Sequence, residues 1–130
     1  MAARGKSARN KGAAGEREFF AILNRFLPER LRVQRDLSQT RDGGADAVVG
    51  GVVIEVKRQE SIRLNSWLKQ ARKAAETWGT HHVPVVAYRK NHGHWRCVVE
   101  MTPQELAAYM RYKKNIDDTI ASIDRAVADL

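Results

Sequence analysis

The sequence predicts an α/β fold, a single domain whose mixed central sheet is flanked by helices. Stretches with helical periodicity alternate with short β-branched stretches in the order αβββαββ, followed by C-terminal helices. A chain of 130 residues is long enough for one domain with a core and too short for two ordinary ones. Apolar residues make up 43% of the chain and charged residues 29%, which is typical of soluble globular proteins.

The first quarter of the chain predicts a helix, a strand and a loop. Residues 1–13 carry four cations among Gly, Ala and Ser, and we interpret them as a flexible basic arm. From Gly15, apolar residues recur at spacings of three and four until Pro28, which predicts a helix. The alternating stretch RLRVQRD, residues 30–36, predicts a strand, and LSQTRDGG, residues 37–44, predicts a polar loop.

The rest of the chain is marked by turn and capping residues. Gly50 and Gly51 predict a two-residue hairpin turn. Residues 64–79 predict a helix with Gly79 as its C-cap, and residues 83–89 and 94–100 predict two more strands. Thr102, Pro103 and Glu105 predict the capped start of a final helical region. We therefore divide the chain into an arm (1–13), a core (14–101) and C-terminal helices (102–130) that serve packing or dimerisation.

The charge and the composition indicate which kind of molecule the protein binds and where in the cell it is found. A net charge of +8 favours a polyanion such as nucleic acid. No apolar stretch approaches the roughly 20 residues that span a bilayer, and the N-terminus lacks the apolar region of a signal peptide. The single cysteine, Cys97, suits a reducing compartment. These features predict no membrane association and a cytoplasmic location, in a bacterial cell or a phage-infected host.

The predicted hairpin brings charged residues together. If Gly50 and Gly51 form its turn, Ala47 faces Ile54, and Asp46 faces Glu55. The face that carries Asp46, Glu55 and Lys57 is opposite the face that carries the apolar residues Ala47, Val49, Val52, Ile54 and Val56. Cross-strand neighbours lie about 5 Å apart, and two ionised carboxylates at that distance repel each other. A divalent cation such as Mg²⁺ compensates this repulsion. The alternative is that Glu55 and Lys57 form the solvated face of a strand and Asp46 is a turn residue.

Two motifs in this part of the chain resemble a known family. GAD, residues 44–46, is followed nine residues after its Asp by EVK, residues 55–57, and this resembles the signature of PD-(D/E)xK nucleases. Ala45 replaces the proline of the signature, which shapes the backbone and takes no part in the chemistry. GEREFFAILNRF, residues 15–26, resembles the first helix of archaeal-type Holliday junction resolvases. The resemblance covers roughly residues 12–100, and it extends to virus-type replication-repair nucleases.

The resemblance implies a restriction-endonuclease-like fold and a metal-dependent active site. It implies that Glu16, Asp46 and Glu55 hold Mg²⁺, for which Mn²⁺ substitutes, with the carbonyl of Val56 as a further ligand. Lys57 would orient the attacking water or neutralise developing charge. The alternative role for Glu16 is to complement the dipole at the N-terminus of its helix.

The resemblance also suggests secondary candidates. Ser38 matches a mobile-loop serine and Gln70 a glutamine near the active site, although a loop hydroxyl and a solvated helix glutamine are equally good interpretations. The candidate DNA-binding cations, which would contact the backbone without reading sequence, are Arg35, Arg41, Arg58, Arg63, Lys69, Arg72 and Lys73.

We therefore expect a Mg²⁺-dependent endodeoxyribonuclease that resembles Holliday junction resolvases and acts on four-way or other branched DNA. A resolvase cuts two strands symmetrically, so a homodimer is expected. The final helix carries a narrow stripe of Ile116, Ile120, Ile123 and Val127, which folds back on the domain or pairs with a second subunit. The alternatives are a related replication-repair nuclease and a DNA-binding module with a degenerate active site.

Overall fold

The computed structural model describes residues 2–33, 46–79 and 82–130. The chain divides into two compact units, Met1–Glu100 and Met101–Leu130. The first unit contains a four-stranded mixed sheet in the order β1-β2-β3-β4. The strands are β1 (Ala47–Val49), β2 (Val52–Arg58), β3 (Val83–Arg89) and β4 (Arg96–Val99). The outer pairs are antiparallel and β2 is parallel to β3, which confirms the predicted α/β class with a mixed sheet.

The hairpin between β1 and β2 has the predicted turn and register. Gly50 and Gly51 have φ angles of +57° and +75°, a conformation that glycine adopts without steric cost. Ala47 pairs with Ile54 and Val49 with Val52, as the two-residue loop requires. The alternating residues of β2 therefore face opposite sides of the sheet, as predicted.

Helix α1 (Ala2–Asn24) is longer than the sequence predicted. The predicted start at Gly15 was wrong, and residues 2–13, which we expected to form a flexible arm, are helical. The physical reason is that Ala, Arg and Lys are strong helix formers, and a helix nucleated by packing over its second half extends through them with little further loss.

The strand predicted for residues 30–36 is wrong where the structure describes it. Glu29–Leu31 form a 3-10 helix, η1, and residues 34–36 lie outside the described residues. The side chain of Asn24 binds both backbone groups of Val33, donating to its carbonyl at 2.8 Å and accepting from its amide at 2.7 Å. This side chain therefore takes the hydrogen bonds that a neighbouring strand would make at Val33.

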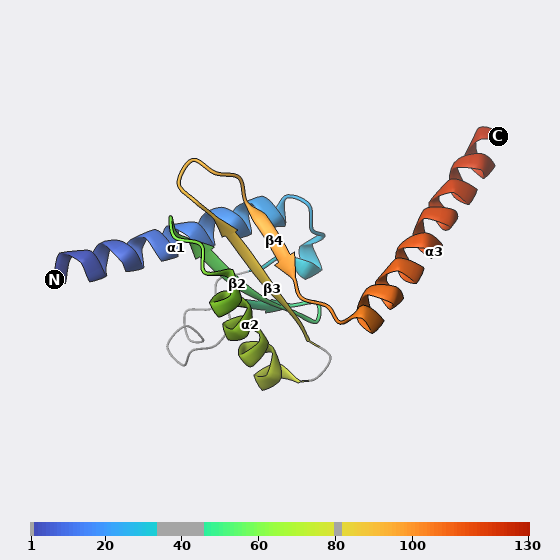
Figure 1. Ribbon diagram of the computed structural model, residues 1–130. Helices are drawn as coiled ribbons and strands as arrows, with labels where there is room; N and C mark the ends of the chain where they lie inside the picture. Colours follow the sequence, from blue (N-terminus) through green and yellow to red (C-terminus); the bar gives the residue numbers. More distant parts are fainter. Residues whose placement is uncertain (1, 34–45, 80–81) are drawn as a thin grey trace. The chain divides into compact units, whose positions relative to one another are not determined.

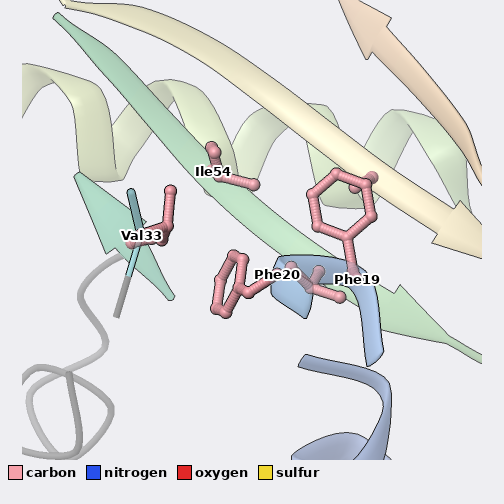
Figure 2. Packing of buried hydrophobic residues seen from close by; sticks show 7 residues of the cluster. Phe19, Phe20, Val33 and Ile54 are labelled. Carbon is pink, nitrogen blue, oxygen red and sulfur yellow. The ribbon is translucent and has the colours of Figure 1, made fainter. Parts of the chain in front are cut away.

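The helices α1 and α2 (Leu64–Trp78) cover opposite faces of the sheet (Figure 1). On one face, Phe19 and Phe20 of α1 pack with Ile54 and Val33 in one cluster, which Figure 2 shows from close by. On the other face, α2 packs Ala74 and Ala75 against Val53, and Trp67 and Ala71 against Val86. The predicted helix is confirmed; Ala74 is buried on its apolar face, whereas Trp78, at its end, is 42% exposed.

The far edge of the sheet is connected to α1 by polar contacts. Strand β4 begins at Arg96, two residues later than predicted. Trp95 instead packs its ring 5.2 Å from that of Phe19 and donates from Nε1 to Glu18 at 2.8 Å. Glu18 also accepts a hydrogen bond of 3.0 Å from Arg89 on β3. These two hydrogen bonds, both accepted by Glu18, hold α1 against the sheet near Arg89 and Trp95.

The second unit contains one helix, α3 (Pro103–Ala128), where the sequence led us to expect several. The predicted capping box is confirmed: the amide of Glu105 donates to the hydroxyl of Thr102, and the carboxylate of Glu105 accepts from the amide of Thr102. Among the described residues, no helix has the length and apolar character needed to cross a bilayer.

Candidate active site

Asp46 lies directly before β1 and is held against β2. The pairing of the two strands ends at Ala47, one position short of the predicted pair of Asp46 with Glu55. The Asp46 amide donates to the carbonyl of Ile54 at 3.0 Å, and its Oδ2 accepts a hydrogen bond of 2.7 Å from the amide of Val56. The carboxylate therefore replaces a backbone acceptor at the position where the neighbouring strand ends. This bond places Asp46 beside the segment that carries Glu55 and Lys57.

Glu55 is the most deeply buried ionisable residue among those described, with 2% of its surface exposed. Its Oε2 lies 3.9 Å from Nζ of Lys57, while its Oε1 has no hydrogen-bond partner among the described residues. Burial raises the pKa of Glu55 to about 8; the negative charge of Asp46 contributes to this rise and Lys57 opposes it. Glu55 is therefore a buried carboxyl group whose hydrogen-bonding capacity is not fully used by the described residues.

Glu16 approaches the same place from α1 and is 8% exposed. Burial raises the pKa of Asp46 to about 6; the hydrogen bond from Val56 lowers it, and the charge of Glu16 and a hydrogen bond with Glu16 raise it. Three acidic side chains from α1, the segment before β1, and β2 are thus electrostatically coupled. The alternative interpretations were a solvated strand face for Glu55 and a turn position for Asp46. They do not fit side chains that are buried to this extent.

Gly15 explains how α1 comes so close to β2. A Cβ atom at Gly15 would lie 3.0 Å from Cβ of Arg58, closer than two such atoms ordinarily approach. The absence of a side chain at this position therefore allows the helix to pass over the end of β2. Glu16, the next residue, is brought to the pocket by this close approach.

An open pocket of about 600 Å³ lies beside these residues. It is lined by Gly12, Glu16, Asp46, Val56, Lys57, Arg58, Gln59, Glu60 and Ser61. Of the predicted catalytic and metal-binding residues, Glu16, Asp46, Val56 and Lys57 line it, whereas Glu55 lies behind the lining in contact with Lys57. The sequence analysis missed residues 59–61, although their position directly after the EVK motif could have indicated them.

Other predicted site residues are not brought to the pocket. Gln70 is exposed on α2 and is not among the residues that line the pocket. Ser38, Arg35 and Arg41 lie outside the described residues. Among the candidate DNA-binding cations that the structure describes, only Arg58 lines the pocket.

The candidate cations on α2 and directly before it differ in whether another side chain of the protein pairs with them. Arg63, Lys69 and Lys73 are exposed. Arg72 instead forms an ion pair with Glu100, so its charge is partly neutralised within the protein. Of the four candidate DNA-binding cations on α2 or directly before it, three therefore have no ion pair within the described residues: Arg63, Lys69 and Lys73.

The chemistry of the acidic residues suits a hard divalent cation. No group of three or more His, Cys, Asp and Glu side chains within the described ranges is arranged as a metal-binding cluster. The side chains nevertheless supply carboxylate oxygens, the ligands that Mg²⁺ prefers, and Glu55 Oε1 lacks any other partner in the part of the chain that is described. Glu16, Asp46 and Glu55 thus fit a Mg²⁺ site by donor type and by burial.

Comparison with known proteins finds no matching family model, no matching curated protein and no matching solved structure. The α/β class with a mixed sheet is what the structure shows, and the restriction-endonuclease-like fold stays a prediction. The functional argument therefore rests on the chemistry of the site and on the motifs in the sequence.

Proposed function

We propose that the protein is a metal-dependent nuclease that hydrolyses phosphodiester bonds in DNA. The observation that carries this proposal is the pair of coupled, buried carboxyl groups of Asp46 and Glu55, whose pKa values are raised to about 6 and about 8, beside the cation of Lys57. Burial of uncompensated negative charge is costly, so these groups keep their protons to a higher pH than usual, and a bound cation would compensate their ionised forms. Perturbed carboxyl groups beside an open pocket are typical of catalytic sites.

More narrowly, we propose a structure-specific endonuclease of the Holliday junction resolvase type. This step rests on the resemblance of residues 15–26, 44–46 and 55–57 to that family. The positive net charge supports DNA as the substrate, because each cation that contacts a phosphate releases counterions. A cytoplasmic location and a homodimer belong to the same proposal.

The side chains of the pocket would have distinct roles. Glu16, Asp46 and Glu55 would hold Mg²⁺ or Mn²⁺, which lowers the pKa of a bound water and polarises the phosphate. Lys57, which lines the pocket, would neutralise charge that develops on the phosphate during attack. The amide of Val56 orients Asp46 through its hydrogen bond, and its carbonyl is a further ligand by resemblance.

The surroundings of the pocket would position the DNA backbone. Arg58 lines the pocket, and Arg63, Lys69 and Lys73 are exposed on or next to α2. In this proposal they contact phosphates and carry no sequence information. Ser38 and Gln70 remain candidates from the resemblance alone, and Arg35 and Arg41 remain candidates from their positions beside and within the polar loop of residues 37–44.

The test is cleavage of three labelled DNA substrates, a four-way junction, a flap and a linear duplex, with Mg²⁺ or Mn²⁺. We expect paired, symmetric nicks in the junction. Lys57→Ala should bind the junction but cut it at least about 100-fold more slowly, as when a group that stabilises transition-state charge is removed. Lys114→Ala, which removes an exposed cation of α3 outside the candidate catalytic and DNA-binding residues, is the matched control and should keep most of the cleavage activity.

The other outcomes distinguish the alternatives. Cleavage of the flap in preference to the junction would identify a replication-repair nuclease. A wild-type protein that binds DNA but cuts none of the substrates with either metal would contradict the nuclease proposal and favour a binding module.

A further inference from the structure

Helix α3 carries a series of mostly apolar residues whose spacings along the sequence alternate between three and four positions. We call this series the α3 seam; it consists of Leu106, Tyr109, Lys113, Ile116, Ile120, Ile123 and Val127. These are the a and d positions of three successive heptads and the first position of a fourth, and Lys113 is the one member that is not apolar. No residue of α3, all of which the structure describes, is buried, and Ile120 and Ile123 are 52% and 57% exposed.

The width of the seam distinguishes α3 from a helix that packs on a sheet. Helix α2 packs on the sheet through a broad face, in which adjacent positions such as Ala74 and Ala75 are both buried. The α3 seam is two positions wide per heptad in its second half, where the positions beside it are polar or small, among them Asp117, Thr119 and Asp124. In its first half, Met110 and Tyr112 lie beside the seam and make the apolar face broader. A strict a/d stripe is the geometry of a coiled-coil seam, whereas a core-facing stripe is broader.

The helix also needs a partner for its own stability. In proteins, most of the stability of a helix comes from burial of an apolar face and less from the helix propensity of its residues. The seam runs through most of the length of α3, so one partner helix of the same length would cover it. A second copy of α3 has this length and the same heptad register, which makes the surface self-complementary.

Lys113 indicates how many helices pair. A single Lys at an a position specifies the register and the oligomeric state of a coiled coil at a cost in stability. The Lys113 ammonium donates to Asp117 of the same helix at 2.7 Å, so its charge is directed to the edge of the seam. Ile116 and Ile123 at the d positions, with Ile120 at a, favour three or four helices. Lys113 opposes this preference, because its charge stays in water at the seam edge of a two-helix pair but would be enclosed in a larger bundle.

We propose that α3 pairs with α3 of a second copy of this chain in a two-stranded coiled coil. The α3 seam is the interface, and Lys113 is the position that limits its stability. The inference does not depend on the proposed nuclease activity, because it rests on the residues of α3 alone.

The test is the mass of the full chain in solution, measured by light scattering over a range of concentrations. We expect twice the monomer mass for the wild type. Ile120→Asp places a charge in the seam and should give the monomer mass. Ser122→Asp adds the same charge on the opposite side of the helix and should keep the dimer.

A second variant tests the seam without disrupting it. Lys113→Ile replaces the single cation in the seam with an apolar side chain, so the dimer should persist to a concentration at least about tenfold lower, as expected when Ile is buried in place of a charge. A wild type that is monomeric at all concentrations, an Ile120→Asp dimer as stable as the wild type, or no tightening with Lys113→Ile would each overturn the proposal.

Discussion

The amide of Val56 donates a 2.7 Å hydrogen bond to the carboxylate of Asp46, ten residues earlier in the chain. The bond forms directly before β1 begins, so a side chain continues the pairing of β1 with β2 where the backbone no longer provides it. It favours the ionised form of Asp46, while burial and Glu16 favour the protonated form. The same contact that orders the end of the hairpin therefore also sets the charge of the candidate site.

The raised pKa values predict how the stability of the metal-free protein depends on pH. Glu55 has a pKa of about 8 in the folded protein against an ordinary value of 4.5, and Asp46 about 6 against 3.8. Between the ordinary pKa and the raised pKa of each group, the folded state keeps a proton that the unfolded chain has released. The free energy of unfolding should therefore be larger at about pH 5 than at pH 8, and it should fall as the pH rises between these values. Urea unfolding in EDTA across this range measures it.

Glu55→Gln is the variant that separates this effect from other titrations. It removes the ionisable group but keeps the size of the side chain, so the fall in stability towards pH 8 should become shallower. Glu60→Gln, which alters a carboxyl group that lines the pocket outside the coupled set, is the matched control. An equal slope in wild type and Glu55→Gln would show that Glu55 does not carry the effect.

Divalent metal should stabilise the protein through the same carboxylates. A ligand that binds only the folded state at 100 times its dissociation constant adds about 2.7 kcal/mol to the free energy of unfolding. We expect Mg²⁺ or Mn²⁺ to raise the melting temperature of the wild type at pH 8. Asp46→Asn should lose most of this rise, and Glu60→Gln should keep it. Thermal unfolding with and without metal is the measurement, and an equal shift in Asp46→Asn and wild type would argue against metal binding at Asp46.

The close approach of α1 to β2 gives a prediction with an internal control. In Gly15→Ala, the new Cβ would lie 3.0 Å from Cβ of Arg58, so Arg58 or α1 has to give by a few tenths of an ångström, next to Glu16. In Gly12→Ala, no described atom lies within 4 Å of the new Cβ. Because Ala is a better helix former than Gly by about 1 kcal/mol, Gly12→Ala should be neutral or stabilising.

Gly15→Ala should lose this advantage and should also weaken metal-dependent stabilisation. Urea unfolding of both variants, with and without Mg²⁺, compares them directly. If Gly15→Ala gained as much stability as Gly12→Ala and responded equally to metal, the packing would not be as tight as the structure indicates.

The cations near the pocket should differ in their contribution to DNA binding. Arg58 lines the pocket, and its Nε has no partner among the described residues, whereas Arg72 is ion-paired with Glu100. Arg58→Ala should weaken binding and reduce the salt dependence, the slope of log K against log salt, by about 0.9. Arg72→Ala should change it much less. Binding titrations at several salt concentrations test this, and the reverse order would contradict it.

The sequence by itself determined the elements whose signals are local. The diglycine turn and the period of two along residues 46–57 leave one register, so the face that carries Glu55 and Lys57 was predictable. The spacing of apolar residues in α2 and the capping box of Thr102 and Glu105 were predictable for the same reason. Each of these signals depends on residues that are near one another in the chain.

Only the tertiary structure decided the contacts between distant segments. Glu16 and Asp46 are separated by thirty positions, and whether they meet depends on how α1 crosses β2 at Gly15. Asn24 replaced a predicted strand contact at Val33, and Glu100 took up the charge of Arg72, neither of which has a local signal. Hydrogen bonds and burial of this kind depend on packing in three dimensions, and the spacing of residues along the chain does not specify them.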